Sequence, residues 1–140
     1  MEAKIDKMKR ILVPTDFSPT SEKAFRIALE MALKSNGKII LYHAYTAVER
    51  TSSVALDKRS ADSNKQTEND LGKRLERFKK KVMANGMDVP VSIALGHNPI
   101  IKNMLGFAKD NHIDLIVMGT QGASGLRKAM PRRMQVQRRS

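Results

Sequence analysis

The chain has 140 residues, enough for one domain with a single buried core. Hydrophobic residues make up 41% and charged residues 29%, a balance that is typical of a folded domain and excludes a disordered chain. There is no cysteine, which excludes disulfides and thiolate chemistry, and no run approaches the roughly 18 apolar residues of a membrane span. The amino terminus lacks the apolar segment of a signal peptide, so we expect a cytoplasmic protein.

The net charge of +12 is unevenly distributed along the chain. Residues 127–140 hold six basic residues and no acid, which is half of the excess. A basic protein invites a nucleic-acid function, but the domain before this tail is only mildly basic, and aromatic residues for stacking on bases make up only 4%. We therefore rank nucleic-acid binding last.

The first third of the sequence predicts a strand, a helix and a second strand. The segment KRILVPTD, residues 9–16, holds a short apolar run stopped by proline, which is typical of a strand buried on both faces. Ser18 and Pro19 predict a helix start, because a hydroxyl caps the first turn and proline fits its first position; helical spacing of apolar residues continues up to Gly37. The segment KIILYHAY, residues 38–45, predicts another buried strand.

The middle of the chain is predicted to be a loop followed by an amphipathic helix. Residues 46–66 are rich in Ser, Thr, Lys and Asp, and we expect them to form a long loop. After the loop, apolar residues step by four, three and four along a helix that is otherwise crowded with charge. They are Leu71, Leu75, Phe78 and Val82, and they predict one buried helical face.

The last third predicts strand, helix and strand again. Residues 89–95 alternate apolar side chains with others and include Pro90, which is typical of a half-exposed strand at the edge of a sheet. Asn98 and Pro99 open a third helix, and residues 114–119 form an apolar strand that runs into glycines. Strand and helix therefore alternate throughout, which predicts an α/β fold with one open parallel sheet and helices on both faces.

A glycine-rich segment follows the last predicted strand, with glycine at every third position from Gly119 to Gly125. Glycine lets backbone N–H groups approach an anion, and a helix beginning near Ser124 would add its positive end. Ligands of open parallel sheets bind at the carboxyl ends of strands, where Pro14–Asp16 and His43–Ala44 also fall. The segment is neither a Walker loop nor a dinucleotide fingerprint, so by itself it indicates either a phosphate site or a tight turn.

Three segments taken together, ILVPTDFS, IILYHA and DLIVMGTQGASGLRKAM, resemble the universal stress protein family in their order and separation. The resemblance covers residues 9–130. It implies a Rossmann-like, adenine nucleotide alpha hydrolase-like sheet of strand order 3-2-1-4-5. We expect a universal stress domain over residues 1–130, followed by a basic, disordered or out-of-register tail over residues 131–140.

For ATP-binding members of this family, the resemblance implies an adenine nucleotide, ATP or AMP, at the strand ends. The residues that would line adenine, ribose and phosphates are Pro14, Thr15, Asp16, Ala44, Met118, Gly119, Gln121 and Gly122. Asp16 would lie near the adenine and ribose, and the backbone of Ala44 would pair with the adenine edge. Mg²⁺ or Mn²⁺ would accompany the phosphates through phosphate oxygens and Asp16, without a metal site formed by the protein alone.

The nucleotide motif of the family, Gly-x2-Gly-x9-Gly-Ser/Thr, is only half present. Gly119 and Gly122 match it, but Arg132 and Arg133 stand at its last two positions. Either the guanidinium groups replace backbone N–H groups in holding phosphate, or the chain after Met130 is out of register with the family. We favour the second interpretation, because PRRMQVQRRS has only two alternating apolar residues to offset its ordering entropy.

Loss of register has consequences for the sheet and for assembly. The fifth strand is then expected to be missing or degenerate, and the fourth strand would be an uncovered edge. The family commonly forms a homodimer through the fifth strand, so the homodimer that the resemblance implies becomes doubtful.

Several candidate residues also have simpler structural explanations. Asp16 suits a turn or a helix cap, and His43 within an apolar strand is more often a satisfied core residue than a base. His97 and His112 are expected on the surface. No general base together with an arginine finger is evident, so we expect a binding module for the stress response, not an enzyme, with at most slow ATP hydrolysis. The alternatives are a family member that binds no nucleotide and acts through protein partners, or a truncated member with impaired binding.

Overall fold

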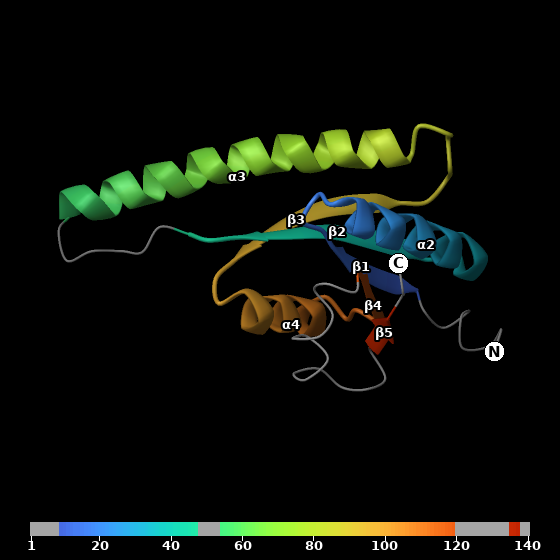
Figure 1. Cartoon of the computed structure of the whole chain (residues 1–140). Helices are drawn as coiled ribbons and strands as arrows, with labels where there is room; N and C mark the ends of the chain where they lie inside the picture. The colour runs from blue at the N-terminus through green and yellow to red at the C-terminus, as the bar shows by residue number, and fades with distance from the viewer. Residues whose placement is uncertain (1–8, 48–53, 120–134, 138–140) are drawn as a thin grey trace.

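A single parallel sheet with helices on both faces organises the chain, as the sequence predicts (Figure 1). The computed structural model describes residues 9–47, 54–119 and 135–137. In chain order the elements are β1 (Arg10–Pro14), α2 (Pro19–Ser35), β2 (Lys38–Tyr45), α3 (Val54–Val82), β3 (Val91–His97), α4 (Ile100–Asp110), β4 (Leu115–Met118) and β5 (Gln135–Gln137). The strand order is β3-β2-β1-β4-β5, so the predicted order is confirmed and β3 is an edge strand.

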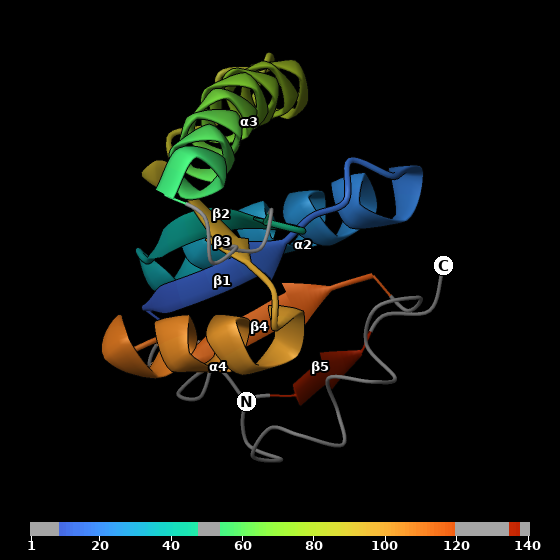
Figure 2. The same cartoon turned by 90° about the vertical axis from the view of Figure 1, so that its left-hand side faces the viewer.

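The two faces of the sheet carry separate layers of helix. Helices α2 and α3 cover one face, and α4 covers the other (Figures 1 and 2). Ile11 and Val13 of β1 face the α2–α3 layer, and Leu12 between them faces α4. Alternate residues of one strand therefore enter different cores, which explains the continuous apolar runs in the sequence.

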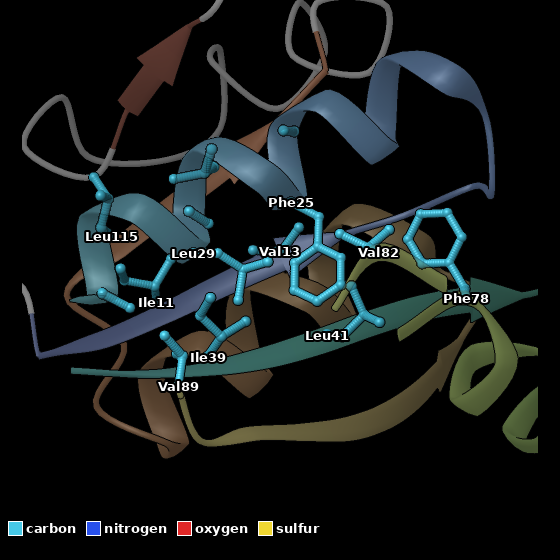
Figure 3. Close-up of a cluster of buried hydrophobic side chains, with 14 of the residues drawn as sticks. Ile11, Val13, Phe25, Leu29, Ile39, Leu41, Phe78, Val82, Val89 and Leu115 are labelled. Carbon is cyan, nitrogen blue, oxygen red and sulfur yellow. The ribbon is translucent and has the colours of Figure 1, made fainter. Parts of the chain in front are cut away.

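The larger core lies between the sheet and the α2–α3 layer (Figure 3). Phe25 of α2 stacks on Phe78 of α3 with ring centroids 6.0 Å apart, so the two helices share one apolar layer. Leu75 is completely buried in the same cluster. The one-sided helix predicted from Leu71–Val82 is therefore confirmed, and its buried face anchors the carboxyl-terminal half of α3 over the sheet.

The start of α2 is fixed by the residues that the sequence predicts. The side chain of Ser18 accepts a hydrogen bond from the backbone N–H of Ser21 (3.1 Å), and Pro19 occupies the first turn. The helix ends at Asn36, which adopts a left-handed conformation with φ of 55°. The capped amino terminus of α2 lies directly after the carboxyl end of β1, where the candidate site is found.

The prediction of a loop over residues 46–66 is wrong for residues 54–66, which form the first part of α3. Side chains such as Lys65 and Gln66 are exposed in this part of the helix. Exposed positions of a helix need no apolar side chain, and Ala, Leu, Lys, Arg and Gln, which residues 54–66 contain, favour helix without an apolar stripe. Hydrophobic periodicity could therefore not reveal it.

The fifth strand is present in a degenerate form of three residues. Strand β5 pairs in parallel with β4, with Gln135, Val136 and Gln137 opposite Ile116–Met118. The expectation that β4 is an uncovered edge is therefore wrong. Backbone pairing orders this segment although its apolar content is small. Arg132 and Arg133 lie outside the described residues.

Candidate ligand-binding site

A cavity of about 360 Å³ opens at the carboxyl end of the sheet. It lies where β1 stands between β2 and β4, which is the point at which the strand order reverses direction. Open α/β sheets bind their ligands at this position. The lining residues come from five elements, β1, α2, β2, α4 and β4, and from the turns after β1 and β4: Pro14, Thr15, Asp16, Ser18, Thr20, Ser21, Tyr42, His43, Ala44, Ile100, Ile101, Met104, Met118 and Gly119.

Six of the residues predicted as ligand contacts line this one cavity. They are Pro14, Thr15, Asp16, Ala44, Met118 and Gly119, and they follow or end three different strands. Gln121 and Gly122 lie outside the described residues. The structure therefore brings together every predicted contact residue that it describes.

A tight turn after β1 shapes one wall of the cavity. The N–H of Thr15 donates to the carbonyl of Tyr42 (2.8 Å), which continues the pairing with β2 by one residue. The hydroxyl of Thr15 accepts from the N–H of Phe17 (3.0 Å) and bonds to the hydroxyl of Ser21 (2.8 Å). These bonds hold Phe17 at a φ of 66°, a conformation that bulky residues rarely adopt and that often marks a functional site.

Asp16 stands at the apex of this turn with its carboxylate exposed and lining the cavity. Its Oδ1 accepts a hydrogen bond from the N–H of Ser18 (3.0 Å). Hydrogen bonds from Ser18 hold the pKa of the Asp16 carboxyl below its ordinary value. The structural explanation, a turn residue, is therefore correct, and it leaves an ionised acceptor at the cavity wall.

His43 is hydrogen-bonded, as the sequence predicts, and also lines the cavity. Its Nδ1 lies 2.7 Å from the carbonyl oxygen of Thr15. Because a carbonyl only accepts, Nδ1 carries the proton, and in the neutral ring Nε2 is an acceptor. The ring packs against Phe17 with centroids 4.7 Å apart. The predicted surface positions of His97 and His112 are confirmed, since both are exposed.

The backbone of Ala44 faces the space beyond the end of β1. The carbonyl of Tyr42 accepts a hydrogen bond from the N–H of Thr15, just after β1. The carbonyl of Tyr45 accepts one from the N–H of Asn98, just after β3. Even-numbered residues of β2 therefore direct their backbone groups toward β1. Strand β1 ends with Pro14 opposite Tyr42, so no residue of β1 lies opposite Ala44.

Sequence reasoning missed the apolar wall, which the first turns of α4 supply. Ile100 and Ile101 are 44% and 37% exposed, unusual values for isoleucine, and Met104 lies deeper beside them. This wall faces the polar one formed by Asp16 and the hydroxyl groups at the start of α2. The signal in the sequence was a pair of isoleucines directly after Pro99, at the start of the predicted helix. The sequence does not show that the crossover from β3 to β4 brings these isoleucines to the cavity.

Residues 9–47, 54–119 and 135–137 contain neither a cluster of metal ligands nor a membrane-spanning helix. Over these ranges no three His, Cys, Asp or Glu side chains are grouped as metal ligands would be. The helices in the same ranges include none that is both long and apolar enough to cross a membrane.

The fold and the position of the cavity define an open α/β protein with a ligand crevice at its topological switch point. The sequence model described as the universal stress protein family matches residues 7–131. The chain therefore belongs to the universal stress protein family.

Individual relatives agree with this assignment. The chain is 29% identical to the universal stress protein MJ0577 of Methanocaldococcus jannaschii over 137 residues, which cover 87% of this chain and 82% of the relative. A solved structure of MJ0577 aligns with a TM-score of 0.71 at 18% identity, covering 95% and 98% of the two chains. The universal stress protein UspA of Lactobacillus plantarum aligns with a TM-score of 0.65 at 23% identity, covering 84% and 80%.

A further structural relative was solved with a ligand. It is a universal stress protein family protein from Arabidopsis thaliana with AMP bound. It aligns with a TM-score of 0.55 at 18% identity, covering 86% of this chain and 81% of the relative. At this identity the likeness establishes the shared fold.

Proposed function

We propose that this universal stress protein binds an adenine nucleotide, ATP or AMP, in the cavity at the carboxyl end of its sheet. In this proposal it acts as a binding module of the stress response and not as an enzyme. The observation that carries the proposal is the convergence of six predicted contact residues on one cavity. Its volume of about 360 Å³ falls within the range of small-molecule pockets, roughly 300–1,000 Å³. The Arabidopsis relative solved with AMP bound supports the same ligand class.

The two walls of the cavity suit the two parts of a nucleoside. Ile100, Met104 and Tyr42 offer an apolar surface for the faces of the adenine ring. The backbone groups of Ala44 point toward the β1 side, where no residue of β1 lies opposite them, so they are available to the polar edge of the base. The Asp16 carboxylate is an acceptor for ribose hydroxyls, which are donors.

The phosphates belong on the side of Gly119 in this proposal. A negative group is repelled by the Asp16 carboxylate, so a part of the cavity away from that carboxylate suits it better. Gly119 has no side chain, and its backbone can approach a phosphate closely. The proposal names the nucleotide alone: a divalent cation would depend on the phosphate oxygens and Asp16, since the described residues hold no group of three metal ligands.

The competing function is a family member that binds no nucleotide and acts through protein partners. Arg132 and Arg133 favour it, because they replace the glycine and hydroxyl residues that complete the family's nucleotide motif. The cavity favours nucleotide binding, because a protein that works only through its surface needs no opening at the switch point.

Calorimetric titration of the full chain with ATP and AMP separates the two functions. GTP is the matched control, since it carries the same ribose and phosphates with a different base edge. We expect saturable micromolar binding of at least one adenine nucleotide and weaker binding of GTP. If the protein melts cooperatively, and is therefore folded, but gives no heat of binding, nucleotide binding is excluded and the function through protein partners is favoured.

A further inference from the structure

We propose that the free edge of β3, together with the face of α3 above it, binds an extended acidic peptide as an added strand. Helix α3 runs over β3 in Figure 1, and a groove lies between the two. We call this surface the β3–α3 groove; it is lined by Ile93 of β3 and by these residues of α3: Glu68, Asn69, Gly72, Lys73, Glu76, Arg77 and Lys80. None of these residues lines the cavity at the carboxyl end of the sheet, so the two surfaces are separate.

The outer edge of β3 presents a regular row of backbone groups. The carbonyl of Pro90 accepts from Ile39, and the N–H of Asn98 donates to Tyr45, so even-numbered residues bond toward β2. Odd-numbered residues of β3 therefore direct their N–H and C=O groups outward. These residues are Val91, Ile93, Leu95 and His97, and over the described part of the chain no strand pairs with them. The carbonyl of His97 already accepts from the side-chain amide of Asn103 (2.7 Å), so the open row runs from Val91 to Leu95.

This edge lacks the features that usually prevent strand addition. Exposed edge strands are normally protected by a charged residue, a proline or a bulge. The sequence VSIALGH of β3 contains no lysine, arginine, acid or proline, and its pairing with β2 runs without interruption from Val91 to His97. The edge is therefore open to an incoming strand, as in peptide recognition by β-augmentation.

Gly72 marks the place where α3 leaves room for an occupant. It lies inside a long helix, where glycine is unfavourable compared with alanine. A Cβ built on Gly72 would meet no atom within 4 Å, so nothing among the described residues requires glycine there. A partner backbone that approaches α3 across the groove explains the absence of a side chain at this position.

The charges along the groove select an acidic partner. Lys73, Arg77 and Lys80 follow one another along the lined face of α3, and no ion pair involving them occurs among the described side chains. Glu68, at one end of the groove, already accepts a hydrogen bond from the hydroxyl of Tyr45 (2.8 Å). Glu76 lines the same face, so the groove holds three cations against two carboxylates, one of which is already hydrogen-bonded to Tyr45. Acidic side chains at alternate positions of an added strand would lie beneath the three cations.

A second copy of the chain is a poorer occupant. Pairing two β3 edges would bring the same three cations of each copy to one interface. The chain also carries a net charge of +12, which opposes self-association. We therefore assign the groove to an acidic peptide segment of another protein.

Fluorescence anisotropy with a labelled peptide tests the assignment on the full chain. The probe is an extended peptide in which Glu alternates with Val or Thr, long enough to pair with Val91–His97; the matched probe carries Lys in place of Glu. We expect saturable binding of the Glu peptide, amide shifts concentrated at odd-numbered residues of β3, and binding of the Lys peptide weaker by about tenfold or more.

Two pairs of variants locate the binding surface. Gly72→Leu should lower the affinity for the Glu peptide by about tenfold or more, because the leucine side chain fills the groove. It should not lower the melting temperature, because leucine favours helix more than glycine does. Gly106→Leu is its control, since Gly106 is also helical with open space around it but lies on α4. Lys73→Glu combined with Arg77→Glu should weaken binding similarly, whereas Lys102→Glu combined with Lys109→Glu on α4 should not.

Each contrary outcome overturns the proposal. Absence of binding, equal binding of both peptides, or shifts away from β3 would do so. So would a Gly72→Leu variant that binds as the parent chain does. Formation of a dimer that the Glu peptide cannot displace would assign the edge to a second copy instead.

Discussion

Gly119, the first residue after β4, lies against Thr20 in the first turn of α2. A Cβ built on Gly119 would lie 2.5 Å from Cγ2 of Thr20 and 3.4 Å from its carbonyl carbon. Both residues line the cavity, so this contact fixes the distance between two of its walls. Glycine is required here by the approach of α2, in addition to any contact with a ligand.

Gly119→Ala should lower the free energy of unfolding by about 1–3 kcal/mol, because the added methyl group overpacks the contact with Thr20. Thr20→Ser in the same chain removes Cγ2 and should restore most of the loss. Urea unfolding measures both effects. Gly106→Ala is the control: its Cβ meets no atom within 4 Å, and it should leave the chain equally or more stable. A Gly119→Ala variant as stable as the parent would contradict the contact.

Asp16→Asn should separate the structural role of this residue from its charge. The amide oxygen can still accept from the N–H of Ser18, so the chain should stay folded, and the melting temperature at neutral pH should fall only by what the charge added to this hydrogen bond. Nucleotide affinity should fall by about tenfold or more, since hydrogen bonds to charged groups contribute about 1.5–3 kcal/mol. Calorimetry on this variant and on Asp110→Asn, an exposed carboxylate on α4, provides the comparison. Equal affinities for the two variants would remove Asp16 from the site.

Acid should affect the same carboxylate in a defined direction. The pKa of Asp16 is held below the ordinary value of 3.8, chiefly by hydrogen bonds from Ser18. The folded state therefore gains stability that is present above the unfolded pKa and is lost as the pH falls through the lowered pKa. Melting temperatures of the parent and of Asp16→Asn should converge only in strong acid. Convergence already near neutral pH would show that the carboxylate does not titrate as described.

Tyr45 should remain protonated well into the alkaline range. Burial, reinforced by its hydrogen bond to Glu68, raises the pKa of Tyr45 to about 12. Its contribution to stability is complete below the unfolded value near 10 and is lost as the pH rises toward about 12. Tyr45→Phe should cost about 1 kcal/mol through the lost hydrogen bond. Absorbance titration checks the pKa; a tyrosine in the folded parent chain that ionises near pH 10 would contradict it, because burial also raises the pKa of Tyr42.

The packing of α3 on the sheet is tested by a matched pair of leucines. Leu75→Ala removes a fully buried side chain and should lower the free energy of unfolding by about 2–5 kcal/mol. Leu33→Ala removes a side chain that is 53% exposed on α2 and should change it by no more than about 0.5 kcal/mol. Similar losses from both variants would mean that α3 does not anchor the core.

The sequence predicted those elements whose side chains are buried on regular faces. Strand β2 has the predicted bounds because both of its faces enter a core, so its apolar run is continuous. The start of α2 was predictable because Ser18 and Pro19 act through local geometry. Residues 54–66 of α3 were not, because their sequence has no regular apolar spacing. Strand β5 is held by backbone pairing with β4, and three residues are too few to show the apolar alternation that would predict a strand.

The candidate site divides in the same way. Asp16, Ala44 and Gly119 stand at strand ends, where parallel topology makes convergence predictable. Ile100 and Ile101 belong to a helix on the other face of the sheet, and their place at the cavity follows from the path of the chain after β3. No local spacing encodes that path, so the apolar wall could be found only in three dimensions.

Amide-resolved titration of the full chain with ATP is the decisive measurement for the proposed nucleotide site. We expect saturable shifts at Asp16, Ala44 and Gly119, with the outward-facing residues of β3 unchanged. Amide shifts confined to other residues, or a spectrum that ATP does not alter while the protein stays folded, would contradict nucleotide binding in this cavity.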